Sequence, residues 1–96
     1  LRWHRGTDLA APTGAPVRAA LGGRVVEAGW RGGYGRTVRL AHEDGSETLY
    51  AHLSAIVVAA GSDVPQGATL GAVGASGLAT GPHLHWGLMW RGQRLD

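Results

Sequence analysis

The stretch RTVRLAHEDGSETLYAHL, residues 36–53, contains two runs of alternating residues on either side of the turn sequence EDGS. Asp44 and Gly45 in this turn supply the tolerance of positive φ that a tight hairpin demands. The two runs therefore predict an antiparallel hairpin, with strands at residues 36–42 and 47–53.

The second strand of this hairpin contains two alternating sets of side chains. Leu49, Ala51 and Leu53 form the apolar set, which we expect to face the core. Because the side-chain period of a strand is two residues, Tyr50 and His52 are then expected to face outward together. Tyr50 is interpreted either as a further hydrogen-bond donor beside His52 or as a packed aromatic residue.

Glycine and proline interrupt the rest of the chain too often for long helices. The sequence has 17 Gly and 4 Pro in 96 residues, and no helix-length stretch with a period of 3.6 residues lacks them. We therefore predict a mainly β protein, an antiparallel sheet of short strands joined by tight turns, without long helices. Beyond the hairpin, strands are expected at residues 24–29, 55–59, 69–73 and 84–90.

Five glycines lie among the turns between residues 58 and 77. We expect them to adopt left-handed or closely packed backbone positions rather than to bind a ligand. They are Gly61, Gly67, Gly71, Gly74 and Gly77.

The composition excludes several classes of site. The nine basic residues are all arginine, and against seven acidic residues they leave a formal net charge of +2. This mild positive charge suits an anionic partner such as a cell-wall polymer. The arginines form no basic stripe of the kind that indicates nucleic-acid binding. The absence of cysteine excludes disulfides and thiolate chemistry. The absence of lysine excludes a Walker-type phosphate loop and a lipoyl or biotinyl carrier domain.

The start of the chain indicates a piece of a longer protein. The first residue is Leu1 rather than Met, and neither a leader sequence nor a run of about 18 apolar residues follows it. We therefore expect residues 1–96 to be one domain, without a signal peptide or membrane span of its own.

Histidines are the main candidates for chemistry. Five occur in the chain, and any one of them taken singly fits an ordinary surface or hydrogen-bonded residue. His83 and His85 differ, because their spacing puts both imidazoles on one face of a strand while Leu84 faces the other. Such a pair has little packing value but suits a metal site or proton transfer. His42, beside the EDGS turn, is expected to be a surface residue.

His4 and Asp8 are a second candidate pair, in a segment that we predict to be a loop or a strand edge. They form either a local ion pair or two zinc ligands, since imidazole and carboxylate both bind Zn²⁺. One histidine of the pair His83 and His85 would complete a set of three ligands, and the other would lie beside the metal. His52, from the neighbouring hairpin, is then available for proton transfer.

Three stretches resemble one family in order and spacing. They are HRGTDLAAPTGAPVRA (4–19), TLYAHLS (48–54) and GASGLATGPHLHWGL (74–88). They look like the M23 family, the LytM/lysostaphin-type zinc metallopeptidases that cut peptide bonds in bacterial peptidoglycan. The resemblance covers essentially all 96 residues.

The resemblance implies a division of roles among five residues. Matching positions imply that His4, Asp8 and His85 bind Zn²⁺, whereas His52 and His83 act as catalytic histidines. The choice of His85 over His83 as the ligand comes from the family alone.

The resemblance also implies a fold, a substrate and a location. The fold is mostly antiparallel β, of the LytM, barrel-sandwich-hybrid type, with the site in a groove on the sheet face. Stem or cross-bridge peptides of peptidoglycan are the expected substrate, in the periplasmic or extracellular part of the cell envelope. The turn RGGYG at residues 31–35 is expected to contribute to specificity.

Two departures from the family pattern stand out. A strand with a Phe-Gly-containing segment normally precedes the first motif, so we expect one strand and part of the groove wall to lie outside residues 1–96. Ala15 stands where many relatives have Thr.

One alternative function remains open. Some relatives of this fold have lost the zinc residues and bind or activate other wall enzymes. A non-catalytic regulator or binding module for cell-wall amidases is therefore the competing hypothesis, although all five matching residues are present here.

Overall fold

The computed structural model describes residues 5–77 and 81–90, and for residues 5–8 and Trp90 it describes the backbone alone. In this part of the chain, eight strands form one antiparallel sheet. The strands are β1 (Arg5–Ala10), β2 (Pro16–Arg18), β3 (Gly23–Trp30), β4 (Arg36–Ala41), β5 (Ser46–Ile56), β6 (Asp63–Val64), β7 (Thr69–Val73) and β8 (His83–Trp90).

A single-turn 3-10 helix, η1 (Gly32–Tyr34), connects β3 to β4, and it is the only helix in the described part of the chain. The prediction of a mainly β protein without long helices is therefore confirmed. No helix in residues 5–77 or 81–90 is long and apolar enough to cross a bilayer.

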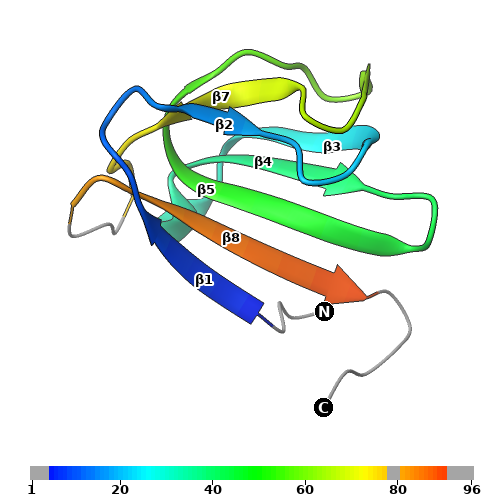
Figure 1. The fold of residues 1–96 in the computed structure, drawn as a ribbon, viewed down its shortest axis with the longest axis horizontal. Coiled ribbons are helices and arrows are strands. Elements are labelled where there is room, and N and C mark those ends of the chain that lie inside the picture. The colour runs from blue at the N-terminus through cyan, green and yellow to red at the C-terminus, as the bar shows by residue number, and fades with distance from the viewer. Residues whose placement is uncertain (1–4, 78–80, 91–96) are drawn as a thin grey trace.

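The longest strand, β5, connects the two parts of the sheet. The strand order is β1-β8-β5-β4-β3-β6, and the end of β5 pairs in addition with β7, which pairs with β2. Figure 1 shows β7 and β2 beside each other at one side of the molecule and β8 and β1 at the opposite side, with β4 and β5 between them. Side chains from both parts therefore enclose one core.

The hairpin of β4 and β5 forms as predicted. Gly45 has a φ of +86°, and the N–H of His42 donates to the carbonyl of Ser46 at 2.9 Å. Asp44 Oδ1 accepts hydrogen bonds from the N–H and the hydroxyl of Ser46, at 2.9 and 2.6 Å. The glycine thus permits the turn, and the carboxylate holds it closed.

The core consists mainly of branched aliphatic side chains. Val38 and Leu40 of β4 are fully buried in it, and Leu84 and Trp86 of β8 pack against it. The face of β8 opposite to His83 and His85 is therefore the core face, as expected from the strand period. The buried cluster contains Val17, Ala19, Val25, Val38, Leu40, Tyr50, Leu53, Leu70 and Val73.

The outward position expected for Tyr50 is wrong, because the alternation along β5 breaks at a bulge. Tyr50 is 1% exposed and belongs to the core, as does Leu53, only three residues later. Between them the β4–β5 register shifts, and His52 has a φ of +61°. An extra residue in one strand reverses the alternation that follows it. Leu49 and Ala51 are also buried, but they lie outside this core cluster.

The surface position expected for His42 is also wrong. Its side chain is 9% exposed, and its Nδ1 lies 2.8 Å from the carbonyl oxygen of Gly22. Its Nε2 lies 2.8 Å from Thr48 Oγ1, which in turn contacts the Tyr50 hydroxyl at 3.1 Å. The Tyr50 oxygen also accepts a hydrogen bond from the N–H of Ala20. A buried polar network therefore occupies this end of the hairpin.

Three short strands were not predicted, and one predicted strand is part of a longer one. Residues 55–56 are the end of β5, and residues 57–59 are not a strand. β1, β2 and β6 were not predicted as strands. The segment of β1 was predicted to be either a loop or a strand edge, and β1 does lie at an edge of the sheet. The glycine predictions hold: Gly61, Gly67 and Gly77 have positive φ, and a Cβ on Gly71 or Gly74 would overlap the backbone of β5.

Candidate functional site

Three histidines from two strands lie together on one face of the sheet. His83 and His85 come from β8, and His52 comes from the neighbouring strand β5. The ring of His52 lies 5.1 Å from that of His83 and 6.0 Å from that of His85, between centroids. The structure thus brings together three of the five residues that the sequence singled out.

The bulge in β5 is what puts His52 on this face. Arg36 pairs with Leu53 and Val38 pairs with Tyr50, so two β5 residues, Ala51 and His52, occupy the space of one. Without the bulge, His52 would share the core face with Tyr50. His52 is also the only non-glycine residue with positive φ in the described ranges. Such a backbone costs about 1–3 kcal/mol and is typical of functional sites.

One ring nitrogen of His52 is hydrogen-bonded to the backbone. Nδ1 lies 2.6 Å from the carbonyl oxygen of Ser76, which can only accept, so Nδ1 carries the hydrogen. Among the residues that the structure describes, none forms a hydrogen bond with Nε2 of His52. In the neutral ring, this second nitrogen therefore offers a lone pair for proton transfer.

An open cleft of about 290 Å³ contains two of these histidines. Its lining consists of Gly33, Tyr34, His52 and His85. The ring of Tyr34 lies 5.7 Å from that of His85, at an interplanar angle of 30°. Tyr34 belongs to the 31–35 turn, which was expected to influence specificity, but the sequence pattern did not indicate its place beside His85.

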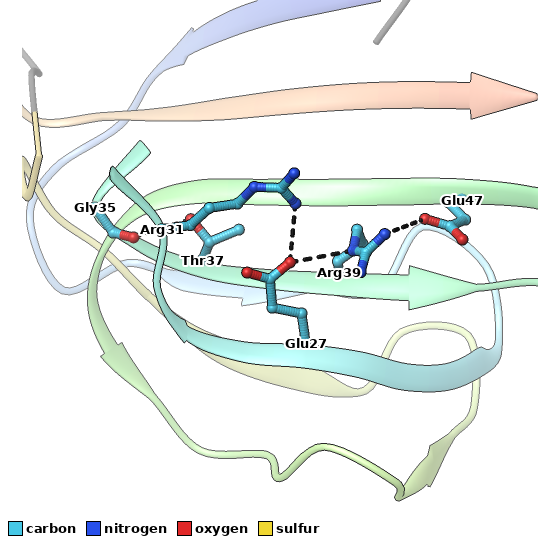
Figure 2. Close-up of polar contacts among 6 residues, drawn as sticks. All are labelled: Glu27, Arg31, Gly35, Thr37, Arg39 and Glu47. Atoms are coloured by element: carbon cyan, nitrogen blue, oxygen red, sulfur yellow. Dashed lines mark hydrogen bonds and ion pairs between the residues drawn. The ribbon is translucent and has the colours of Figure 1, made fainter. Parts of the chain in front are cut away.

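Ion pairs hold the η1 turn that carries Tyr34 (Figure 2). Arg31 donates to Glu27 Oε1 at 2.9 Å, and its guanidinium lies 6.0 Å from the centre of the Tyr34 ring. Glu27 Oε1 also lies 3.2 Å from Nε of Arg39, whose Nη1 donates to Glu47 at 2.9 Å. These contacts connect the turn to β3, β4 and β5. Partly exposed pairs of this kind each contribute at most about 1 kcal/mol, so we assign them to orientation more than to stability.

The backbone register relates β1 to the histidines. In the β1–β8 ladder Asp8 is directly opposite His85, and Ala10 is opposite His83. Positions directly opposite in an antiparallel pair belong to the same face of the sheet. His4, the remaining candidate, lies outside the described residues.

The described side chains do not contain a complete metal site. Among the side chains that the structure describes, no group of three His, Cys, Asp or Glu is arranged to hold a metal ion. In the backbone ladder, β1 pairs with β8 at His85. Imidazole and carboxylate are suitable donors for Zn²⁺, so the donor groups of the candidate set His4, Asp8 and His85 fit zinc.

A protein-family model described as peptidase family M23 matches residues 2–96. The chain therefore belongs to the M23 family. The resemblance inferred from its three motifs is confirmed.

Individual relatives support the same assignment. The DD-carboxypeptidase/endopeptidase Mpg of Neisseria meningitidis serogroup B is 50% identical over 95 residues, which are 99% of this chain and 22% of Mpg. The peptidoglycan DD-endopeptidase ShyC of Vibrio cholerae is 39% identical over 92 residues, 96% of this chain and 21% of ShyC. The chain thus spans about a fifth of the length of these curated relatives.

A solved structure shows the same fold. The crystal structure of a zinc-containing peptidase from Vibrio cholerae superposes with a TM-score of 0.87 at 36% identity. The superposition covers 95% of this chain and 28% of that one.

Proposed function

We propose that this domain is a zinc-dependent endopeptidase that hydrolyses peptide bonds in stem or cross-bridge peptides of bacterial peptidoglycan. The observation that carries the proposal is the position of His85 in this M23 domain. It lies between Asp8 and Ala51 in the sheet, with the rings of His52 and Tyr34 beside it.

We assign His4, Asp8 and His85 as the zinc ligands. The support for Asp8 is its register with His85, because facing residues of a ladder are close enough to share one ion. The support for His4 is the sequence motif, and a zinc-containing relative has the same fold. When bound, Zn²⁺ supplies Lewis-acid chemistry, polarising a peptide carbonyl and making water a nucleophile near neutral pH.

We assign His52 and His83 as the catalytic histidines. Nδ1 of His52 donates to the Ser76 carbonyl, so Nε2 is the atom that can accept a proton from the attacking water. Nδ1 of His83 lies 2.8 Å from the carbonyl oxygen of Gly81, an arrangement that orients its ring in the same way. One histidine can thus take a proton while the other steadies the oxyanion or protonates the leaving amine.

The relatives support the proposed substrate and location. ShyC is a peptidoglycan DD-endopeptidase, and Mpg is a DD-carboxypeptidase/endopeptidase. Peptidoglycan lies in the cell envelope, so we place this domain in its periplasmic or extracellular part. A peptide segment of peptidoglycan is the partner expected in the cleft.

The test is zinc content together with hydrolysis. We expect about one zinc per chain in the purified full-length protein, cleavage of purified peptidoglycan, loss of cleavage with a chelator and recovery with added zinc. Metal-free protein that cleaves nothing but assembles with a cell-wall amidase would contradict the proposal. It would instead support the non-catalytic regulator.

The division of roles within β8 has its own test. His83→Ala is expected to abolish cleavage while zinc content remains close to one per chain. His85→Ala is expected to lose both cleavage and zinc, because it removes a ligand. Equal zinc loss in the two variants would refute the assignment.

A further inference from the structure

The segment of residues 74–77, between β7 and β8, contacts both strands that carry the histidines. The N–H of His83 donates to the carbonyl of Gly74 at 3.2 Å, which connects the segment to β8. Nδ1 of His52 donates to the carbonyl of Ser76 at 2.6 Å, which connects it to β5. A shift of this segment would therefore move the rings of His52 and His83 relative to each other.

The same segment also packs against the η1 turn. Gly77 has a φ of +75°, and a Cβ at this position would lie 2.5 Å from the carbonyl oxygen of Gly33 and from the nitrogen of Gly35. This close approach leaves no room for a side chain. The segment is thus confined between η1 on one side and the bulge of β5 on the other.

The hydroxyl of Ser76 bonds to the two strands at the bulge. Oγ accepts a hydrogen bond from the N–H of Arg36 at 3.0 Å and donates one to the carbonyl of Leu53 at 2.6 Å. Arg36 and Leu53 are paired residues of β4 and β5, immediately beyond His52. One residue therefore holds the backbone at the bulge through its hydroxyl and the ring of His52 through its carbonyl.

We infer that Ser76 is a positioning residue for His52. Its hydroxyl holds its own carbonyl where it accepts the Nδ1 hydrogen, and this selects the tautomer and the ring orientation that leave Nε2 at the cleft. The inference rests on the proposed function, in which His52 handles protons. Ser76 itself does not line the cleft and is not one of the assigned zinc ligands.

The kinetic test uses three variants of the full-length protein. Ser76→Ala removes the hydroxyl and keeps the carbonyl. We expect kcat on peptidoglycan to fall about 10–100-fold, by analogy with the loss of outer-shell groups that orient ligating histidines. KM should stay within about twofold, because substrate contacts are unchanged. Ser76→Thr keeps the hydroxyl and should restore most of kcat.

Ser62→Ala is the matched control. The Ser62 hydroxyl also donates to a backbone carbonyl, that of Ala59, at 2.6 Å, but it lies in a turn outside the cleft. This variant should keep its full kcat. An equal loss in Ser62→Ala and Ser76→Ala would overturn the inference, as would a loss in Ser76→Ala that simply follows a loss of zinc or of folded protein.

A second readout does not depend on activity. ¹⁵N NMR of the histidine rings in metal-free protein should show His52 in the Nδ1–H tautomer, and Ser76→Ala should show a mixture of tautomers. An unchanged tautomer in Ser76→Ala would overturn the inference. If the unaltered protein neither binds zinc nor cleaves peptidoglycan, the proposed function fails, whereas the tautomer comparison still decides the role of Ser76.

Discussion

His42 and His52 lie near opposite ends of one hairpin, and they are equally buried, at 9% exposed. Each lies beside a cleft, one of about 850 Å³ at His42 and one of about 290 Å³ at His52. His42 uses both ring nitrogens within the protein, on Gly22 and Thr48. His52 uses only Nδ1 among the described residues.

Under the proposed roles, neither burial nor cleft size distinguishes the catalytic histidine from the structural one. The larger cleft contains the histidine whose nitrogens are both engaged, and the smaller one contains the histidine with an available Nε2. The backbone differs as well, because His52 has positive φ and His42 does not. Under the proposed function, the positive φ and the second ring nitrogen of His52 are the features that separate it from His42.

The largest effect is expected at His52. His52→Asn keeps a side chain that tolerates positive φ, but it removes the titratable nitrogen. We expect kcat for peptidoglycan cleavage to fall about 10²–10⁴-fold, the usual contribution of a general acid or base. Thermal unfolding should change little. A variant that retains cleavage within a few-fold would place the proton chemistry elsewhere.

The opposite pattern is expected at His42. His42→Ala leaves the buried carbonyl of Gly22 and the hydroxyl of Thr48 without their partner, which costs about 1–3 kcal/mol in the free energy of unfolding. Urea unfolding would measure this cost, and kcat per folded molecule should stay unchanged. A selective loss of kcat in this variant would remove the contrast between the two histidines.

The smallest effect concerns Asp44, in the turn beside His42. Hydrogen bonds from the hydroxyl and the N–H of Ser46 lower the pKa of the Asp44 carboxyl below its ordinary value of 3.8. The ionised form is therefore favoured by folding, so its stabilisation is present above pH 3.8 and is lost as the pH falls through the lower folded pKa.

Asp44→Asn tests this dependence. The variant should be less stable than the unaltered protein at neutral pH, by less than the His42 effect, and the difference should shrink as the pH falls below 3.8. Urea unfolding at several pH values would measure it. A difference that stays constant with pH would show that the carboxylate charge contributes nothing.

Much of the fold could be predicted from local signals. The Asp-Gly turn and its flanking runs predicted the β4–β5 hairpin, and the frequency of glycine predicted a β protein with tight turns. The two-residue spacing of His83 and His85 predicted their common face, because the period of a strand is a local property of the backbone.

The predictions that failed share one physical cause, because each feature depends on contacts between separate segments of the chain. The bulge at His52 reverses the alternation of β5, and no residue type in TLYAHLS predicts a bulge. His42 is buried because two residues satisfy its ring nitrogens. One is Gly22, which is distant in the chain, and the other is Thr48 of the neighbouring strand β5. β1 became a strand through pairing with β8, more than seventy residues later in the chain.

The sequence by itself determined the fold class, the M23 motifs and the candidate residues, because turn chemistry, strand period and motif spacing are encoded locally. Only the tertiary structure decided that a bulge puts His52 on the face of His83 and His85, that Tyr50 enters the core and that Ser76 accepts the Nδ1 hydrogen. These outcomes depend on a register shift and on contacts between segments far apart in the chain. Such contacts are set by the packing of the whole sheet.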